Sequence, residues 1–142
     1  MSGMSATQRR TRSTPRGRKK VVDEAREFAI GVARIADEQK TEGVAVLDLR
    51  GLSNLADYFV IGTGTSGRQM HATLDRIDEH ATQLGRVAFS REASGGTSWL
   101  LADYVDVVVH LFDEEHRAYY DLDGLWGDAP RVAWQSNGAD RE

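Results

Sequence analysis

The apolar positions near the start of the chain follow the period of a helix. Between residues 22 and 40 they recur at steps of three and four, and Val21, Phe28 and Ile35 widen the stripe. Such a stripe predicts a helix that packs one face on the core. The stripe itself consists of Val22, Ala25, Ala29, Val32 and Ala36.

Residues 44–84 predict two strands and a second helix. Apolar runs at residues 44–49 and 58–61 are strand-sized, and "GLSN" between them marks a turn. After "GTGTSG", Ser66 is placed to cap a helix, and Gln69 follows three residues later, as a capping box requires. Apolar residues then continue at steps of four and three as far as Gly85, which predicts that the helix ends there.

The C-terminal half predicts three strands and a last helix. We expect a strand at residues 86–91 and then two strands, "SWLLADY" and "DVVVHLF", which a tight turn around Val105 joins into a hairpin. Asp113 is placed to cap a helix over residues 114–121. The order of elements predicts an α/β or α+β fold, with a single mixed β-sheet of about five strands and helices packed on it.

Charge divides the chain into three parts. Residues 1–20 hold seven basic residues and no acidic one, residues 21–130 carry the predicted elements, and residues 131–142 are polar and expected to fray. The basic tail is typical of a solvated segment or of one that contacts RNA. Its twin arginine has no apolar stretch after it, which argues against export.

The composition also excludes several classes of protein. Cysteine is absent, so disulfides, thiolate nucleophiles and cysteine-ligated metals are excluded. No apolar run approaches the roughly 18 residues that a membrane-spanning helix needs. We therefore expect a cytoplasmic protein with no membrane contact.

The Gly-rich turn at residues 62–67 raises the question of phosphate binding. A turn between a strand and a helix exposes backbone amides that favour an anion. However, the lysine of a Walker motif is missing, as is a dinucleotide fingerprint with its distal acid. A tight turn with a good cap is the favoured interpretation, and a nucleotide-binding enzyme is the alternative.

Nucleotidyl transfer would need two carboxylates that alternate on one strand and hold the same metal pair. The acids that follow Ser66 are Asp75 and Asp78 on a predicted helix and Asp103 and Asp106 beside a turn. His110 lies alone in a strand and is expected to be a hydrogen-bonded core or face residue. We therefore expect no enzyme, no metal and no cofactor.

The aromatic residues near the C-terminus suggest an interface. Tyr119 and Tyr120 are about 100° apart on a helix, so at most one can point fully at the sheet. Trp99 and Leu101 alternate with other apolar residues, so both faces of their strand are apolar. A self-association surface is one explanation, and a docking surface for another protein is the other.

Two long stretches resemble the ribosomal silencing factor family RsfS, also called Iojap. They are "ADYFVIGTGTSGRQ" and "SWLLADYVDVVVHLFDEEHRAYYDLDGLWGDA", and the resemblance covers about residues 21–130. It implies a nucleotidyltransferase-like topology without the catalytic acids. It also implies a non-enzymatic factor that binds the large ribosomal subunit and prevents the small subunit from joining, which silences translation when nutrients are scarce.

The resemblance also implies the partner and the contact residues. The family's partner is the ribosomal protein numbered fourteen, on the intersubunit face of the large subunit. The positions that match its contacts are Trp99, Tyr104, Tyr120, Leu125 and Trp126. Whether the chain is a monomer or a weak homodimer, and whether the basic tail contacts ribosomal RNA, is left open.

Overall fold

A five-stranded mixed sheet organises the chain. The computed structural model describes residues 23–94 and 98–135. The sheet order is β1-β2-β5-β4-β3, and only β2 and β5 pair in parallel. The elements are α2 (Glu24–Glu38), β1 (Glu42–Asp48), β2 (Tyr58–Thr63), α3 (Gly67–Gln83), β3 (Ser90–Ser94), β4 (Trp99–Asp103), β5 (Val107–Phe112), α4 (Glu114–Tyr120) and α5 (Leu122–Leu125). The predicted α+β fold with about five strands is confirmed.

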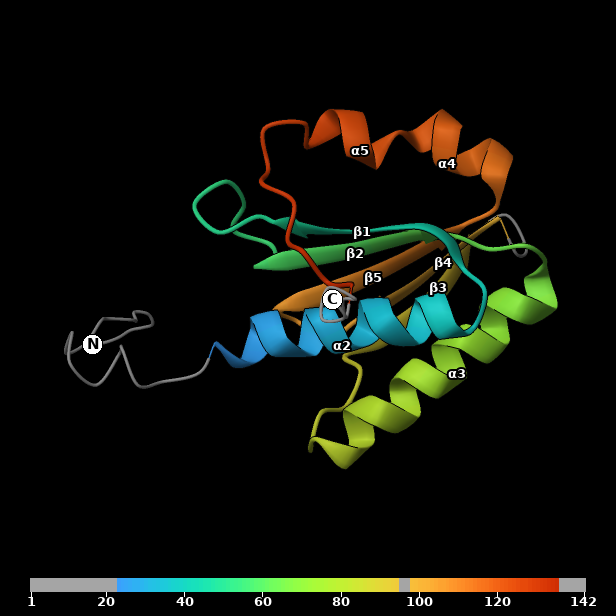
Figure 1. Cartoon of the computed structure of the whole chain (residues 1–142), viewed down its shortest axis with the longest axis horizontal. Helices are drawn as coiled ribbons and strands as arrows, with labels where there is room; N and C mark the ends of the chain where they lie inside the picture. The colour runs from blue at the N-terminus through green and yellow to red at the C-terminus, as the bar shows by residue number, and fades with distance from the viewer. Residues whose placement is uncertain (1–22, 95–97, 136–142) are drawn as a thin grey trace, which may run out of the picture.

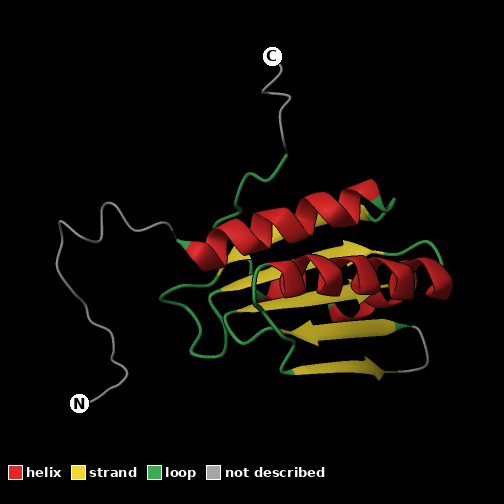
Figure 2. Cartoon of the chain, turned by 90° about the horizontal axis from the view of Figure 1, so that it is seen from below, coloured by secondary structure: helices red, strands yellow, loops and turns green. Residues whose placement is uncertain are grey.

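Helices cover both faces of the sheet. Figure 1 shows α2 and α3 on one side and α4 and α5 on the other, and Figure 2 shows α2 and α3 lying over the strands. The buried apolar residues accordingly form two clusters, one on each face of the sheet. Leu100 and Ala102 of β4 belong to the cluster under α2 and α3, whereas Trp99 and Leu101 pack on the cluster under α5. Alternate side chains of β4 therefore point to opposite faces of the sheet and pack in two separate cores.

The predicted caps and the hairpin turn are confirmed. Ser66 Oγ accepts a hydrogen bond from Gln69 N at 3.0 Å, and Asp113 Oδ1 accepts one from His116 N at 2.8 Å. Each bond satisfies an amide that the first turn of a helix leaves free. Val105 has φ +80°, as the tight turn between β4 and β5 requires.

One predicted strand boundary was wrong, the last helix is confirmed at Glu114–Tyr120, and one short helix was not predicted. The strand expected at residues 86–91 lies instead at Ser90–Ser94. Val87 and Phe89 come before it and are 84% and 78% exposed, so they do not face the core as the apolar pattern suggested. The last helix is followed by a second short helix that was not predicted. Asp121 adopts φ +48°, which ends α4, and its Oδ1 then accepts from Gly124 N and caps α5.

Residues 131–135 pack against the sheet, so the expectation that residues 131–142 fray was wrong for this part, and residues 136–142 lie outside the described residues. Val132 N donates to Val46 O at 2.9 Å, and Arg131 forms an isolated bridge with Leu47. Trp134 is buried, and its indole N–H donates to Val44 O at 3.1 Å. The two buried side chains and the hydrogen bonds together hold the segment along β1, and Figure 1 shows it passing that strand. This segment blocks the β1 edge of the sheet.

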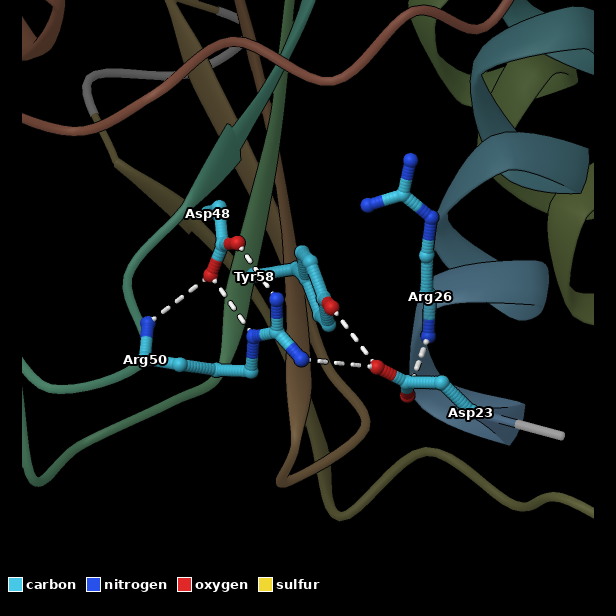
Figure 3. A network of polar contacts seen from close by, with 5 residues as sticks. All are labelled: Asp23, Arg26, Asp48, Arg50 and Tyr58. Carbon is cyan, nitrogen blue, oxygen red and sulfur yellow. Dashed lines mark hydrogen bonds and ion pairs between the residues drawn. The ribbon is translucent and has the colours of Figure 1, made fainter. Parts of the chain in front are cut away.

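A polar network ties the start of α2 to the strands (Figure 3). One Asp23 oxygen accepts from Arg26 N at 3.0 Å, and the other accepts from Arg50 Nη1 at 3.1 Å and Tyr58 Oη at 2.9 Å. Arg50 also forms two bonds from its guanidinium to Asp48. Burial, together with the bond to Asp23, raises the pKa of Tyr58 to about 12. One carboxylate is therefore both a helix cap and a tie to β2.

Replacing Asp23 by alanine is expected to lower the free energy of unfolding by about 1 kcal/mol, because the cap and the tie to Tyr58 are lost together. The exposed position of the Arg50 pair limits the effect. Urea unfolding measures it. Asp23→Asn keeps an oxygen that accepts from Arg26 N and should retain most of the stability; equal losses in both variants would contradict the capping role.

Candidate protein-binding surface

Five side chains from β4, α4 and α5 form what we call the aromatic surface: Trp99, Tyr119, Tyr120, Leu125 and Trp126. Tyr119 and Leu125 are 76% and 71% exposed, and Tyr120 is 38% exposed. The two tryptophans are half-buried. Apolar groups of this size at a helix-covered sheet face are what a partner protein can use as anchors.

Trp99 is the centre of the aromatic surface. Its ring lies 5.1 Å from that of Phe112 and 4.6 Å from that of Tyr120, measured between centroids. Its indole N–H donates to His110 Nδ1 at 3.2 Å. Trp99 is therefore held from below by β5 and from the side by α4, with part of its ring left in solvent.

Trp126 joins the same layer through a chain of ring contacts. Trp126 meets Phe59 edge-on with centroids 6.1 Å apart, and Phe59 meets His110 at 4.4 Å. His110 in turn contacts Trp99 at 5.9 Å. Edge-to-face contacts of this kind add stability beyond the area they bury. The sites on α5 and β4 are thus one continuous layer.

Arg117 fastens α4 and α5 to the strands. Its Nε and Nη2 bond both oxygens of Asp123, at 3.2 and 2.9 Å. Its Nη1 donates to Gly43 O at 2.6 Å and to Thr63 Oγ1 at 3.1 Å. Burial raises the pKa of Asp123, but the bonds and charge of Arg117 outweigh it and hold the pKa below its usual value. One guanidinium therefore connects both helices to β1 and β2.

Replacing Arg117 by methionine is expected to lower the free energy of unfolding by about 2 kcal/mol, because it keeps the side-chain stem but leaves Asp123 and Gly43 O without their donor. Thermal unfolding measures the loss. Arg131→Met is the matched control, since Arg131 is 55% exposed and reaches Asp123 at only 3.6 Å. A control as damaging as Arg117→Met would contradict the account.

Tyr104 is separate from the other predicted contact residues. It is 4% exposed and lies in the cluster under α2 and α3, with its ring 5.1 Å from that of Phe28. Its hydroxyl donates to Asp78, and burial followed by this bond raises its pKa. Because Tyr104 and Trp99 differ by an odd number of positions, they face opposite sides of the sheet. Tyr104 is a core residue, and the prediction that it contacts a partner protein was wrong.

Three residues of the site escaped the sequence analysis. Phe59 and Phe112 form the floor under Trp126 and Trp99, and Arg117 fixes the helices above them. The period of two along β5 places Phe112 on the same face as His110. The sequence pattern could therefore have predicted that Phe112 lies beneath Trp99. Arg117 and Asp123 are six residues apart on two short helices, and no local pattern pairs them.

The Gly-rich turn is filled by protein groups. Gly64 N donates to Phe112 O at 2.7 Å, and Thr65 N donates to Gln69 Oε1 at 3.1 Å. A Cβ on Gly64 would lie 2.0 Å from Met70 Cγ, so only glycine fits there. Gln69 Nε2 also donates to Gln39 O at 2.7 Å. These contacts favour the packed turn over a phosphate site.

The acids considered for metal binding are engaged in the fold. Asp106 pairs with Arg86 at 2.8 Å, and Asp78 accepts from Tyr104 and pairs with Arg91. Within residues 23–94 and 98–135, no group of three His, Asp or Glu side chains is arranged to hold a metal ion. None of the helices in the same part of the chain is long and apolar enough to cross a membrane.

The sheet and the aromatic surface define an α+β domain with two covered sheet faces and exposed rings at one end. A family model described as "Ribosomal silencing factor during starvation" matches residues 22–142. The chain belongs to this family, RsfS or Iojap, as its sequence motifs suggested.

Individual relatives agree with this assignment. The chain is 40% identical over 98 residues to "Ribosomal silencing factor RsfS" of Bacillus subtilis, covering 69% of this chain and 83% of that protein. It is 38% identical over 108 residues to "Protein Iojap, chloroplastic" of Zea mays, covering 74% of this chain and 46% of that one. A crystal structure from Bacillus halodurans superposes with a TM-score of 0.63 and 33% identity, covering 79% and 99% of the two chains.

Proposed function

We propose that this chain binds the large ribosomal subunit at ribosomal protein fourteen, on the intersubunit face, and sterically blocks joining of the small subunit. Translation would be repressed in this way under nutrient limitation. Membership of the ribosomal silencing factor family supports silencing as the function. The single observation that supports protein docking as the means is the aromatic surface, with Trp99 at its centre.

The anchors in this proposal are Trp99, Tyr120, Leu125 and Trp126. Large rings at the centre of an interface supply most of its affinity, whereas the surrounding contacts mainly exclude water. Tyr120 and Leu125 are exposed, so a partner protein can contact them directly. Trp99 can be contacted through the part of its ring that is in solvent. Binding through four such groups needs no rearrangement of the sheet.

Exposed acidic side chains flank these anchors along the chain. Glu114 and Glu115 begin α4, and Asp121 and Asp128 are exposed on either side of α5. A rim of one sign steers a partner of the opposite sign and suppresses wrong partners. The rim therefore favours a basic partner, which suits a protein embedded in ribosomal RNA.

The mechanism requires only occupancy of a surface. A bound domain of this size excludes any second body that must approach the same face, so no bond has to be made or broken. Its affinity has to compete with that of the small subunit. Each buried aromatic anchor contributes about 2 kcal/mol or more to such an affinity.

Sedimentation with separated ribosomal subunits tests the binding step. The chain should pellet with the large subunit and remain at the top of the gradient with the small one. Tyr120→Ala should weaken pelleting, while Leu55→Ala, an 82% exposed side chain in the loop between β1 and β2, should leave it unchanged. A chain that pellets with neither subunit, or equally with both, would remove the proposal.

A further inference from the structure

His110 lies directly beneath the aromatic surface, on β5. It is 5% exposed, and its ring is in contact with Phe59, Trp99 and Phe112. Its Nδ1 lies 3.2 Å from Trp99 Nε1. An indole nitrogen can only donate, so Nδ1 must accept and the proton of the neutral ring must be on Nε2. The contact thus fixes both the tautomer and the direction of the bond.

Packing alone gives no reason for a histidine at this position. His110 Nε2 is buried and has no hydrogen-bond partner in the described part of the chain. A buried donor without a partner is unfavourable, whereas phenylalanine would fill nearly the same space without one. The hydrogen bond that the imidazole does make is at its other nitrogen, which holds Trp99.

Trp99 needs such a restraint because only part of its ring is packed. The neighbouring rings of Phe112 and Tyr120 are tilted by 29° and 44° relative to it and contact it without directional bonds. A tryptophan at the rim of a core has alternative side-chain rotamers of similar energy. The hydrogen bond to His110 selects the one in which the indole N–H points into the sheet and the free edge points out.

We propose that His110 is a positioning residue, whose Nδ1 fixes the Trp99 indole in the orientation that meets the partner protein. This inference rests on the proposed docking function. Holding an anchor in its bound orientation increases affinity by reducing the entropy lost on binding. Burial lowers the pKa of His110 to about 4, so Nδ1 keeps its lone pair at neutral pH.

Two variants separate positioning from packing. His110→Phe keeps a ring of similar shape but removes the acceptor, and His110→Asn places an amide oxygen where Nδ1 lies. The first readout is the NMR signal of the Trp99 indole N–H, assigned with Trp99→Phe. In His110→Phe this proton should exchange faster with water than in the native chain, and in His110→Asn it should stay protected.

The second readout is affinity for the large ribosomal subunit. His110→Phe removes the unpaired Nε2–H but leaves the part-buried Trp99 N–H without its acceptor, so its melting temperature should stay close to the native value. It should nevertheless bind about tenfold more weakly, the change that loss of one hydrogen bond's restraint can produce. His110→Asn should recover most of the affinity despite a lower melting temperature. A variant that is as stable as the native chain and binds less well is not explained by a structural role.

The outcomes distinguish this inference from the proposed function. Native affinity in His110→Phe, or equal loss of affinity in both variants, would overturn positioning and leave the docking proposal intact. If the native chain does not bind the large subunit, docking fails. In that case the exchange rate of the Trp99 indole N–H is the remaining test of the restraint. Faster exchange in His110→Phe supports the restraint, and unchanged exchange refutes it. Should His110→Phe not fold, loss of indole protection in His110→Asn overturns the inference.

Discussion

Replacing Trp99 by alanine is expected to raise the dissociation constant for the large ribosomal subunit about 30-fold to 1,000-fold. This range corresponds to the roughly 2 to 4 kcal/mol that a central aromatic anchor supplies to an interface. We expect this large loss of affinity because Trp99 is at the centre of the aromatic surface, where it connects β4 to α4 through Tyr120 and to β5 through Phe112 and His110. Equilibrium binding to purified large subunits measures the effect.

Part of the Trp99 ring is packed, so the variant will also be less stable and needs a matched control. Val87→Ala removes an apolar side chain that is 84% exposed at the opposite end of the β3-β4 hairpin. It should bind like the native chain. Binding is to be compared at a temperature where circular dichroism shows both variants folded. A folded Trp99→Ala with native affinity would show that the aromatic surface is not the docking site.

Lowering the pH from 7 to 4 is expected to remove about 3 kcal/mol of stability through His110 alone. Burial lowers its pKa from 6.5 to about 4. Below pH 6.5 the unfolded chain binds a proton at this residue, and the folded chain does not until about pH 4. Stability linked to His110 is therefore complete above pH 6.5, falls between 6.5 and 4, and is constant below 4.

Urea unfolding of the native chain and of His110→Phe, at several pH values between 4 and 8, measures this contribution. The carboxylates titrate in both proteins, so the difference between the two curves belongs to His110. That difference should be level above pH 6.5 and change by up to about 1.4 kcal/mol per pH unit below it. Parallel curves across the whole range would show that His110 takes up its proton at the same pH in the folded and the unfolded chain, which would contradict the lowered pKa.

Local patterns accounted for the elements whose cause is local. The apolar stripes predicted α2 and α3 because one face of each helix packs on the sheet, and Ser66 and Asp113 were identified as caps because the bond spans three residues. The hairpin at Val105 followed from two apolar runs with almost nothing between them. In each case the stabilising contact lies within a few residues of its own sequence.

Contacts between distant segments were beyond such patterns. Residues 131–135 hold only three apolar residues next to a polar tail, and their pairing with β1 accounts for the burial of Val132 and Trp134. The short helix α5 depends on Asp121 at positive φ and on the link from Asp123 to Arg117, which no periodicity reveals. Both features therefore required the tertiary structure.

The predicted contact residues divide in the same way. Trp99, Tyr120 and Trp126 pack on one side of the sheet, and Leu125 belongs to α5, which lies on the same side (Figure 1). Tyr104 follows Trp99 at an odd spacing and points into the opposite core, against Phe28. The alternation of a strand already separated these two residues, and the motif resemblance had placed them together.

Joining of the two ribosomal subunits in the presence of the chain tests the central claim most directly. Purified large subunits are incubated with the native chain or with Trp99→Ala, small subunits are added, and the fraction of joined ribosomes is read from a sucrose gradient. The native chain should lower the fraction of joined ribosomes, whereas joining with Trp99→Ala should be near normal. Unchanged joining in the presence of saturating native chain would contradict the central claim.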